Sequence, residues 1–159
     1  MKILLPIDGS QLSLEAVRFA IRLAREGLQT SFVLANVQEP ATLYEVMLAH
    51  DAEVLERVKG AAGEHLLQGA EALLAEAGIE YEREVLSGDP AHALVDIIER
   101  FECDAVVMGA RGLGALSGAL VGSVSQALMR ASPVPVTIVR PHAAPEAEAD
   151  ETEAETPSS

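Results

Sequence analysis

The chain has 159 residues, of which 49% are hydrophobic and 3% aromatic, and its formal net charge is −14. An acidic chain repels DNA and anionic membrane surfaces, and scarce aromatic residues argue against a platform that stacks single-stranded bases. The lone cysteine excludes an intrachain disulfide and a cysteine-based metal site. The length predicts one domain. The first eight residues carry too short an apolar run for a signal peptide, no run approaches a membrane span, and we expect a cytoplasmic location.

The chain begins with an alternation of strand and helix signals. Ile3–Ile7 is apolar throughout, which is typical of a strand buried on both faces of a parallel sheet. Asp8-Gly9-Ser10 predicts the turn, and either Ser10 or Ser13 is the candidate helix N-cap. The following helix has an apolar face and ends near Gly27. That face comprises Leu14, Val17, Ile21, Ala24 and Leu28.

The second unit is less regular. Ser31–Val37 predicts a second buried strand. From 41 to 77 the pattern is mainly helical, although each of Gly60, Gly63 and Gly69 costs about 1 kcal/mol relative to alanine in a helix interior. We therefore expect a mobile stretch over 41–52 and then a long helix that ends at Gly78.

The third unit carries an edge strand and a well-marked helix. Ile79–Leu86 contains four charged residues, which indicates an edge protected against pairing. Gly88-Asp89-Pro90 opens the next helix, with Asp89 as N-cap and Pro90 at the first helical position. Its apolar face is formed by Leu94, Ile97, Ile98 and Phe101.

The most informative segment lies between two further strands, Ala105–Met108 and Val134–Val139. It holds five glycines and then a helical pattern over 122–131. Glycine lets backbone approach a ligand closely, and a helix N-terminus presents N–H groups and a positive dipole end. The alternation predicts a doubly wound parallel sheet, whose ligands bind at the carboxyl ends of strands. We therefore predict a site for the phosphates of a nucleotide.

Particular residues have candidate roles in that site. Asp8 would accept hydrogen bonds from adenine or ribose or hold Mg²⁺ through water, although it is also explained as a helix cap. Val37 would contact adenine, or only pack in the core. Gly109 and Gly112 would allow close approach of the ribose and α-phosphate. The remaining candidates are Gly122, Ser123 and, more weakly, Ser125 for the outer phosphates, Arg111 as a phosphate partner or a surface arginine, and the chain neighbours Pro6, Ile7, Met108 and Val124.

Four ordered motifs resemble the universal stress protein family. Gly109-Ala-Arg-Gly112, nine residues and then Gly122-Ser123 match its G-x2-G-x9-G-[ST] pattern. The segments 3–10, 88–91 and 133–140 are similar to its first strand and turn, the entry to its third helix and its last strand. The resemblance covers residues 1–141. It implies five parallel strands in the order 3-2-1-4-5 with helices on both faces (the adenine nucleotide α-hydrolase-like fold) and dimerisation through Val134–Val139.

The function that the resemblance implies is a nucleotide-dependent switch or sensor in the stress response, with ATP as ligand, ADP or AMP as alternatives, Mg²⁺ as a companion ion and an unknown protein partner. The alternatives are a nucleotide-free dimeric interaction module and a slow ATPase or self-phosphorylating protein rather than a dedicated enzyme. The insert 113–121 has no basic residue, unlike that of many nucleotide-binding relatives, so we expect modest affinity. A P-loop motif is absent from the sequence.

Two further segments carry expectations of their own. The stretch 41–52, with Tyr44, Met47 and His50, would fold over the nucleotide site, or serve as an ordinary amphipathic connection. The segment 142–159 holds six acidic residues and neither Lys nor Arg. Such a composition buries too little apolar surface to offset its ordering entropy, and we expect an acidic, disordered tail.

Overall fold

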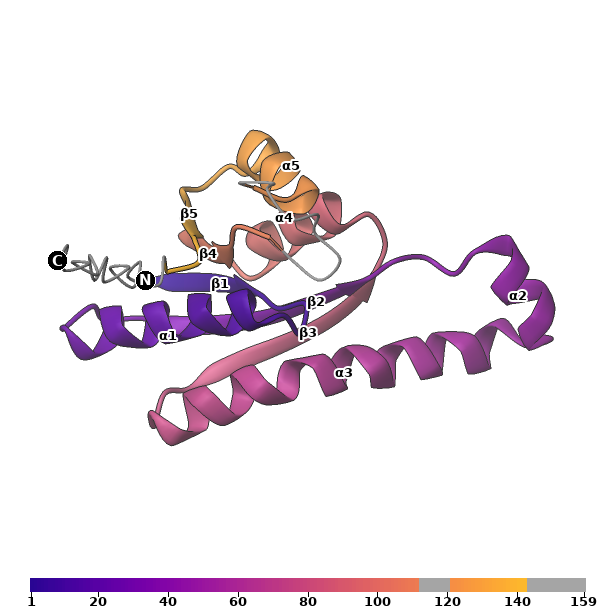
Figure 1. Ribbon diagram of the computed structural model, residues 1–159, viewed down its shortest axis with the longest axis horizontal. Helices are drawn as coiled ribbons and strands as arrows, with labels where there is room; N and C mark the ends of the chain where they lie inside the picture. Colours follow the sequence, from indigo (N-terminus) through magenta and orange to yellow (C-terminus); the bar gives the residue numbers. More distant parts are fainter. Residues whose placement is uncertain (112–120, 143–159) are drawn as a thin grey trace, which may run out of the picture.

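The computed structural model describes residues 1–111 and 121–142, and five parallel strands form a single sheet in them (Figure 1). The order β3-β2-β1-β4-β5 confirms the predicted one, and every neighbouring pair is parallel. The charged strand β3 is one edge and β5 is the other. The strands are β1 (Lys2–Pro6), β2 (Ser31–Gln38), β3 (Tyr81–Ser87), β4 (Ala105–Gly109) and β5 (Val136–Val139).

Helices cover both faces of the sheet, as predicted. Side chains of α1 and α3 form one core with the strands, and side chains of α4 and α5 line the core on the opposite face. Strand β1 contributes to both cores, because successive side chains of a strand point to opposite faces. The helices are α1 (Gln11–Arg25), α2 (Leu43–Ala49), α3 (Ala52–Glu76), α4 (Pro90–Arg100) and α5 (Ser123–Ala131).

The local helix signals are largely confirmed. Ser10 rather than Ser13 is the N-cap of α1, and its hydroxyl accepts a hydrogen bond from the Ser13 backbone at 3.1 Å. Asp89 caps α4, with Pro90 at its start. The expectation for Leu28 was wrong: α1 ends at Arg25, so Leu28 lies beyond the helix and is 36% exposed.

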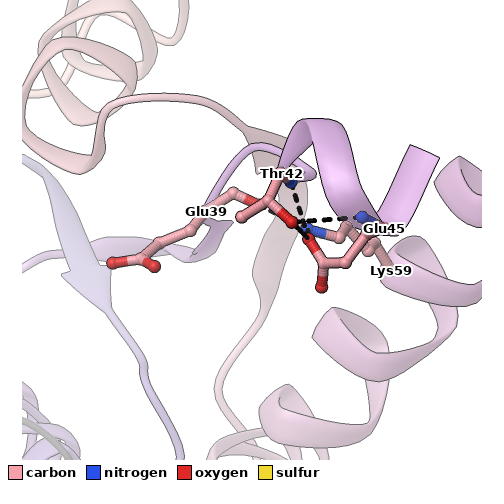
Figure 2. A network of polar contacts seen from close by, with 4 residues as sticks. All are labelled: Glu39, Thr42, Glu45 and Lys59. Carbon is pink, nitrogen blue, oxygen red and sulfur yellow. Dashed lines mark hydrogen bonds and ion pairs between the residues drawn. The ribbon is translucent and has the colours of Figure 1, made fainter. Parts of the chain in front are cut away.

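The segment after β2 contains a short helix. Residues 43–49, within the stretch for which we expect mobility, form α2, whose N-terminus has a capping box between Thr42 and Glu45. Figure 2 shows these side chains beside Lys59 of α3, whose ammonium donates to the Glu39 carbonyl at 2.9 Å. Hydrogen bonds from the backbone and hydroxyl of Thr42 hold the pKa of Glu45 below its ordinary value. Polar contacts therefore fix α2 on α3.

Of the two predictions for 41–52, the position of helix α2 fits the ordinary connection and not a cover over the nucleotide site. It packs on the N-terminal end of α3, beyond the sheet and away from α5 (Figure 1). Tyr44 and Met47, which the other alternative places over the site, are 70% and 69% exposed. In the described parts of the chain, no helix is long and apolar enough to span a membrane.

The glycines of α3 do not interrupt it, and Gly63 has a packing role. A Cβ atom there would lie 2.5 Å from the Val85 side chain and 2.9 Å from the Asn36 amide oxygen. A side chain at Gly60 would meet nothing within 4 Å. The helix therefore approaches β2 and β3 too closely at Gly63 for any other residue.

The contrast in packing between Gly63 and Gly60 generates a paired prediction. Gly63→Ala should lower the free energy of unfolding by about 1–3 kcal/mol, because overpacking outweighs the gain in helix propensity. Gly60→Ala should raise it by up to about 1 kcal/mol, because only propensity changes. Urea denaturation of both variants measures the two effects. Equal stabilisation by the two substitutions would contradict the close approach of α3 to the sheet.

Candidate functional site

The centre of the sheet brings two distant segments to one edge. Strands β1 and β4 are neighbours, with Ile3 opposite Ala105 and Leu4 opposite Val106. Because both strands are parallel, their carboxyl ends meet at the same edge, where strand order reverses. Asp8 follows β1, and Gly109 ends β4. The two residues therefore belong to adjacent strand ends.

The start of α5 is joined to the end of β4. The backbone N–H of Gly122 donates to the Ala110 carbonyl at 2.6 Å. The Ser125 hydroxyl is buried and lies 3.1 Å from the carbonyl oxygens of both Gly109 and Ala110. These contacts fix the N-terminus of α5 directly above the strand end.

Among the described residues, no side chain caps α5. Gly122 is its N-cap residue and makes no side-chain cap hydrogen bond. Ser123 is therefore the first helical residue rather than the N-cap, and it is exposed. Val124 beside it is 36% exposed. The first-turn N–H groups of a nine-residue helix give this edge a positive dipole end.

The turn after β1 is held by polar contacts. One carboxylate oxygen of Asp8 accepts a hydrogen bond from the Ser10 backbone at 2.9 Å, so the carboxylate takes part in the turn before α1. The Ile7 backbone N–H donates to the Ala35 carbonyl of β2 at 2.8 Å. These bonds place Asp8, which is partly exposed, at the edge of the site.

Sequence reasoning missed Asn36. Its side chain is 2% exposed, and its amide donates to the Ile7 carbonyl at 2.7 Å. Its amide oxygen accepts from the Gln38 side chain at 2.6 Å. Asn36 thus fixes the peptide unit immediately before Asp8. The signal was present, because Asn36 is the one polar residue inside an otherwise apolar run from Phe32 to Val37.

Several predicted site residues have buried side chains that a ligand cannot reach. Ile7 is 2% exposed, Met108 6% and Ser125 3%, so these residues offer a ligand mainly their backbone. Pro6 and Val37 are half-buried, and Val37 packs against the core under α4 and α5.

The remaining predicted residues lie near the glycine segment. Packing alone also explains why residue 109 is glycine, since a Cβ there would lie 3.1 Å from the Leu12 backbone of α1. Arg111 is half-buried. Gly112 and the insert up to residue 120 lie outside the described residues.

The site offers little to a metal ion by itself. Among the described residues, no group of three His, Cys, Asp or Glu side chains is arranged to hold a metal. Asp8 is the carboxylate at this edge. The arrangement therefore presents backbone N–H groups and hydroxyls at this edge with the Asp8 carboxylate beside them, and groups of the first two kinds are suited to an anion.

Comparisons with known proteins agree on one family. A model of the universal stress protein family matches residues 1–140. The universal stress protein YxiE of Bacillus subtilis is 30% identical, over 87% of this chain and 98% of that protein. The universal stress protein MJ0531 of Methanocaldococcus jannaschii is 29% identical, over 87% of this chain and 81% of that protein.

Solved structures share the fold. The universal stress protein UspA from Lactobacillus plantarum superimposes with a TM-score of 0.75 at 22% identity, over 88% of this chain and 97% of that one. A universal stress protein solved in complex with cAMP gives 0.65 at 26% identity, over 87% and 96%. A family protein from Arabidopsis thaliana with AMP bound gives 0.64 at 20% identity, over 90% and 93%.

The position of Asn36 yields a test. Asn36→Leu should lower the free energy of unfolding by about 1–3 kcal/mol, because the Ile7 carbonyl loses a buried donor. It should also release the turn that carries Asp8, which amide hydrogen exchange at Gly9 and Ser10 would detect. Gln38→Ala is the control: it removes only the outer contact of Asn36, and its effect should stay below 1 kcal/mol. Unchanged exchange in Asn36→Leu would contradict the role of this side chain.

Proposed function

The chain belongs to the universal stress protein family, and from that premise we propose that it binds an adenine nucleotide, ATP first among them, at the carboxyl ends of β1, β2 and β4. In this proposal it is a cytoplasmic, homodimeric switch or sensor in the stress response. ADP and AMP are alternative ligands of the same site.

One observation carries the proposal. Helix α5 begins without a side-chain cap, is bonded to the end of β4, and exposes Ser123 beside its first-turn N–H groups. A helix N-terminus of this kind binds phosphate through its backbone donors and its dipole. Local donors matter here because the chain as a whole is acidic and does not attract an anion at long range.

The other half of the ligand would lie against β1 and β2. Asp8 would accept hydrogen bonds from the ribose or adenine, and Val37 would supply apolar contact at the end of the neighbouring strand. The relatives solved with cAMP and with AMP support an adenine nucleotide over other anions. Arg111 would pair with the phosphates.

Mg²⁺ fits this site only as a companion of the phosphates. Proteins that bind Mg²⁺ with nucleotides supply one or two carboxylates, and the phosphates and water supply the other ligands. Asp8 would hold the ion through water, where it would neutralise phosphate charge. A nucleotide without Mg²⁺ should therefore still bind, more weakly.

A separate observation favours the interaction-module function. Helix α2 has no buried residue, and several large apolar side chains of α2 and early α3 are exposed. A patch of this kind marks a contact surface. Under the switch proposal it is the surface offered to a protein partner. The patch comprises Leu43, Tyr44, Met47, Leu48, Val54 and Val58.

The phosphate site predicts a difference between two serines. Ser123→Ala should weaken binding of Mg-ATP by about tenfold, with an unchanged melting temperature of the free protein, because Ser123 is exposed. Ser125→Ala should instead cost the free protein about 1 kcal/mol, because its buried bonds to β4 are lost. Saturating ligand at 100 times its Kd stabilises by about 2.7 kcal/mol, which scanning calorimetry resolves.

The outcomes separate the candidate functions. The absence of any shift of the wild type at millimolar ATP, ADP or AMP would contradict the nucleotide proposal and favour the interaction module. If phosphate is released above the buffer rate by the wild type and not by Ser123→Ala, the slow-ATPase alternative gains support. A rate of phosphate release by the wild type equal to that of buffer alone would contradict that alternative.

The composition of the edge strand β5 predicts that the protein forms a homodimer. Strand β5 has three apolar, β-branched residues and no charge, so its open side favours pairing with a second copy. Thr137 is the exposed residue of this strand. Thr137→Lys should convert the proposed dimer to a monomer, because like charges would face each other across the two-fold axis. Light scattering at micromolar concentration measures this, with Thr30→Lys as the control; a monomeric wild type would contradict the dimer.

A further inference from the structure

Helix α2 turns an apolar side away from α3. Residues three and four positions apart share a face of a helix, and four large apolar residues of α2 have these spacings. They are Leu43, Tyr44, Met47 and Leu48, with exposed fractions of 78%, 70%, 69% and 60%. Glu45 lies on a different side of α2 and pairs with Lys59 of α3 at 3.8 Å. The side of α2 that faces α3 is therefore polar, and the apolar side faces solvent.

This orientation is set by polar contacts rather than by a core. Helix α2 has no buried residue. Lys59 donates to the Glu39 carbonyl at 2.9 Å, beside the capping box of Thr42 and Glu45 (Figure 2). An apolar surface that stays in water is unfavourable, and covering it releases free energy. A surface that is already ordered also loses little conformational entropy when a partner binds.

The charged residues around this apolar surface are mostly acidic. Residues 43–58, which form α2 and the start of α3, contain four acids and one base, Arg57. Lys59, the next base along the chain, has a side chain only 16% exposed and already bonded to Glu39 and Glu45. A basic partner is attracted to such a rim, and an acidic one is repelled. The four exposed acids are Glu45, Asp51, Glu53 and Glu56.

The same charges argue against two other occupants. A second copy would bring an identical set of acids against the first across a two-fold axis. An anionic membrane surface would be repelled as well. An added strand would find no open edge, because backbone groups inside a helix bond within it. Another helix, in contrast, can pack along α2 with its ridges in the grooves between side chains.

We propose that the apolar patch of α2 and early α3 binds a basic amphipathic helix of another protein. The apolar side of that helix covers Tyr44 and Met47, and its Lys or Arg side chains pair with Glu53 and Glu56. This inference rests on the contact surface in the proposed function and adds the chemistry of the partner. It does not depend on nucleotide binding. The interface is small, and interfaces below about 1,200 Å² of total area are weak and transient.

The probe is a synthetic amphipathic helical peptide with Leu on one side and Lys on the other. Titrated without nucleotide into the ¹⁵N-labelled full-length protein at low salt, it should shift the amide signals of residues 43–58 most, with one Kd. A second peptide, with Glu in place of every Lys, should bind at least tenfold more weakly. In 1 M NaCl the Debye length falls to about 3 Å, so the two peptides should then bind alike.

The apolar contact is tested by one pair of variants. Tyr44→Ala with Met47→Ala should weaken binding of the Lys peptide at least tenfold. The melting temperature should not change, because both side chains are exposed. Leu28→Ala with Met129→Ala is the matched control, since these residues are 36% and 44% exposed outside the patch. This control should bind the peptide like the wild type.

The charge contact is tested by a second pair. Glu53→Gln with Glu56→Gln should weaken binding of the Lys peptide about threefold at low salt, as expected for exposed ion pairs. Glu26→Gln with Glu99→Gln removes the same charge from exposed positions outside residues 43–58 and should leave the Kd unchanged. Equal weakening by both pairs would overturn the proposal, because the peptide would then sense only the net charge of the chain.

Other outcomes separate this inference from the functions proposed above. Equal binding of the Lys and Glu peptides at low salt would overturn the basic partner and leave the contact surface standing. No shift in residues 43–58 at millimolar peptide would overturn both. Nucleotide binding is tested by other signals, and its failure would not change these results.

The remaining occupants have their own signatures. In Thr137→Lys, whose β5 edge is blocked, self-association that disappears on adding Tyr44→Ala and Met47→Ala would assign the patch to a second copy. Cosedimentation with neutral phosphatidylcholine vesicles that the same two substitutions abolish would assign it to a lipid surface. Either result would overturn the proposal.

Discussion

The parallel pairing of β1 with β4 is the contact on which the rest of this molecule depends. It joins two halves of the chain that are about a hundred residues apart, with Ile3 opposite Ala105. It also makes the strand order reverse at the centre of the sheet, so the turn with Asp8 and the end of β4 share one edge. Without this pairing the end of β4 would have no carboxylate of β1 beside it.

Buried polar side chains fix the backbone at that edge of the sheet through hydrogen bonds. Asn36 binds the Ile7 carbonyl, and Ser125 binds the carbonyls of Gly109 and Ala110. A buried carbonyl without a donor is costly, so each of these side chains fixes its backbone segment in one conformation. Ser123, in the first turn of α5, is exposed at the surface instead. A buried serine and an exposed serine thus stand two residues apart on one helix.

The sequence predicts those features that depend on local chemistry. The apolar run of β1, the cap at Asp89 and the charged edge β3 each follow from neighbouring residues, whereas the strand order came from the family resemblance. Features that depend on tertiary contact were missed. From the sequence, Gly63 only lowers the helix propensity, and its packing against Val85 of β3 is known from the structure alone. The hydrogen bond from Asn36 to the Ile7 carbonyl likewise joins residues far apart in the sequence, so no local pattern predicts it. The bounds of helix α2 were not predicted, because its apolar residues face no core.

The central claim is that an adenine nucleotide binds where β1, β4 and α5 meet. The most direct measurement is a titration of the ¹⁵N-labelled full-length protein with AMP, with and without Mg²⁺, followed by amide chemical shifts. The account predicts the largest shifts at Gly9, Gly109, Ser123 and Val124, all saturating with one Kd. Shifts confined to residues away from this edge, or no shift at any residue at millimolar AMP, would contradict it.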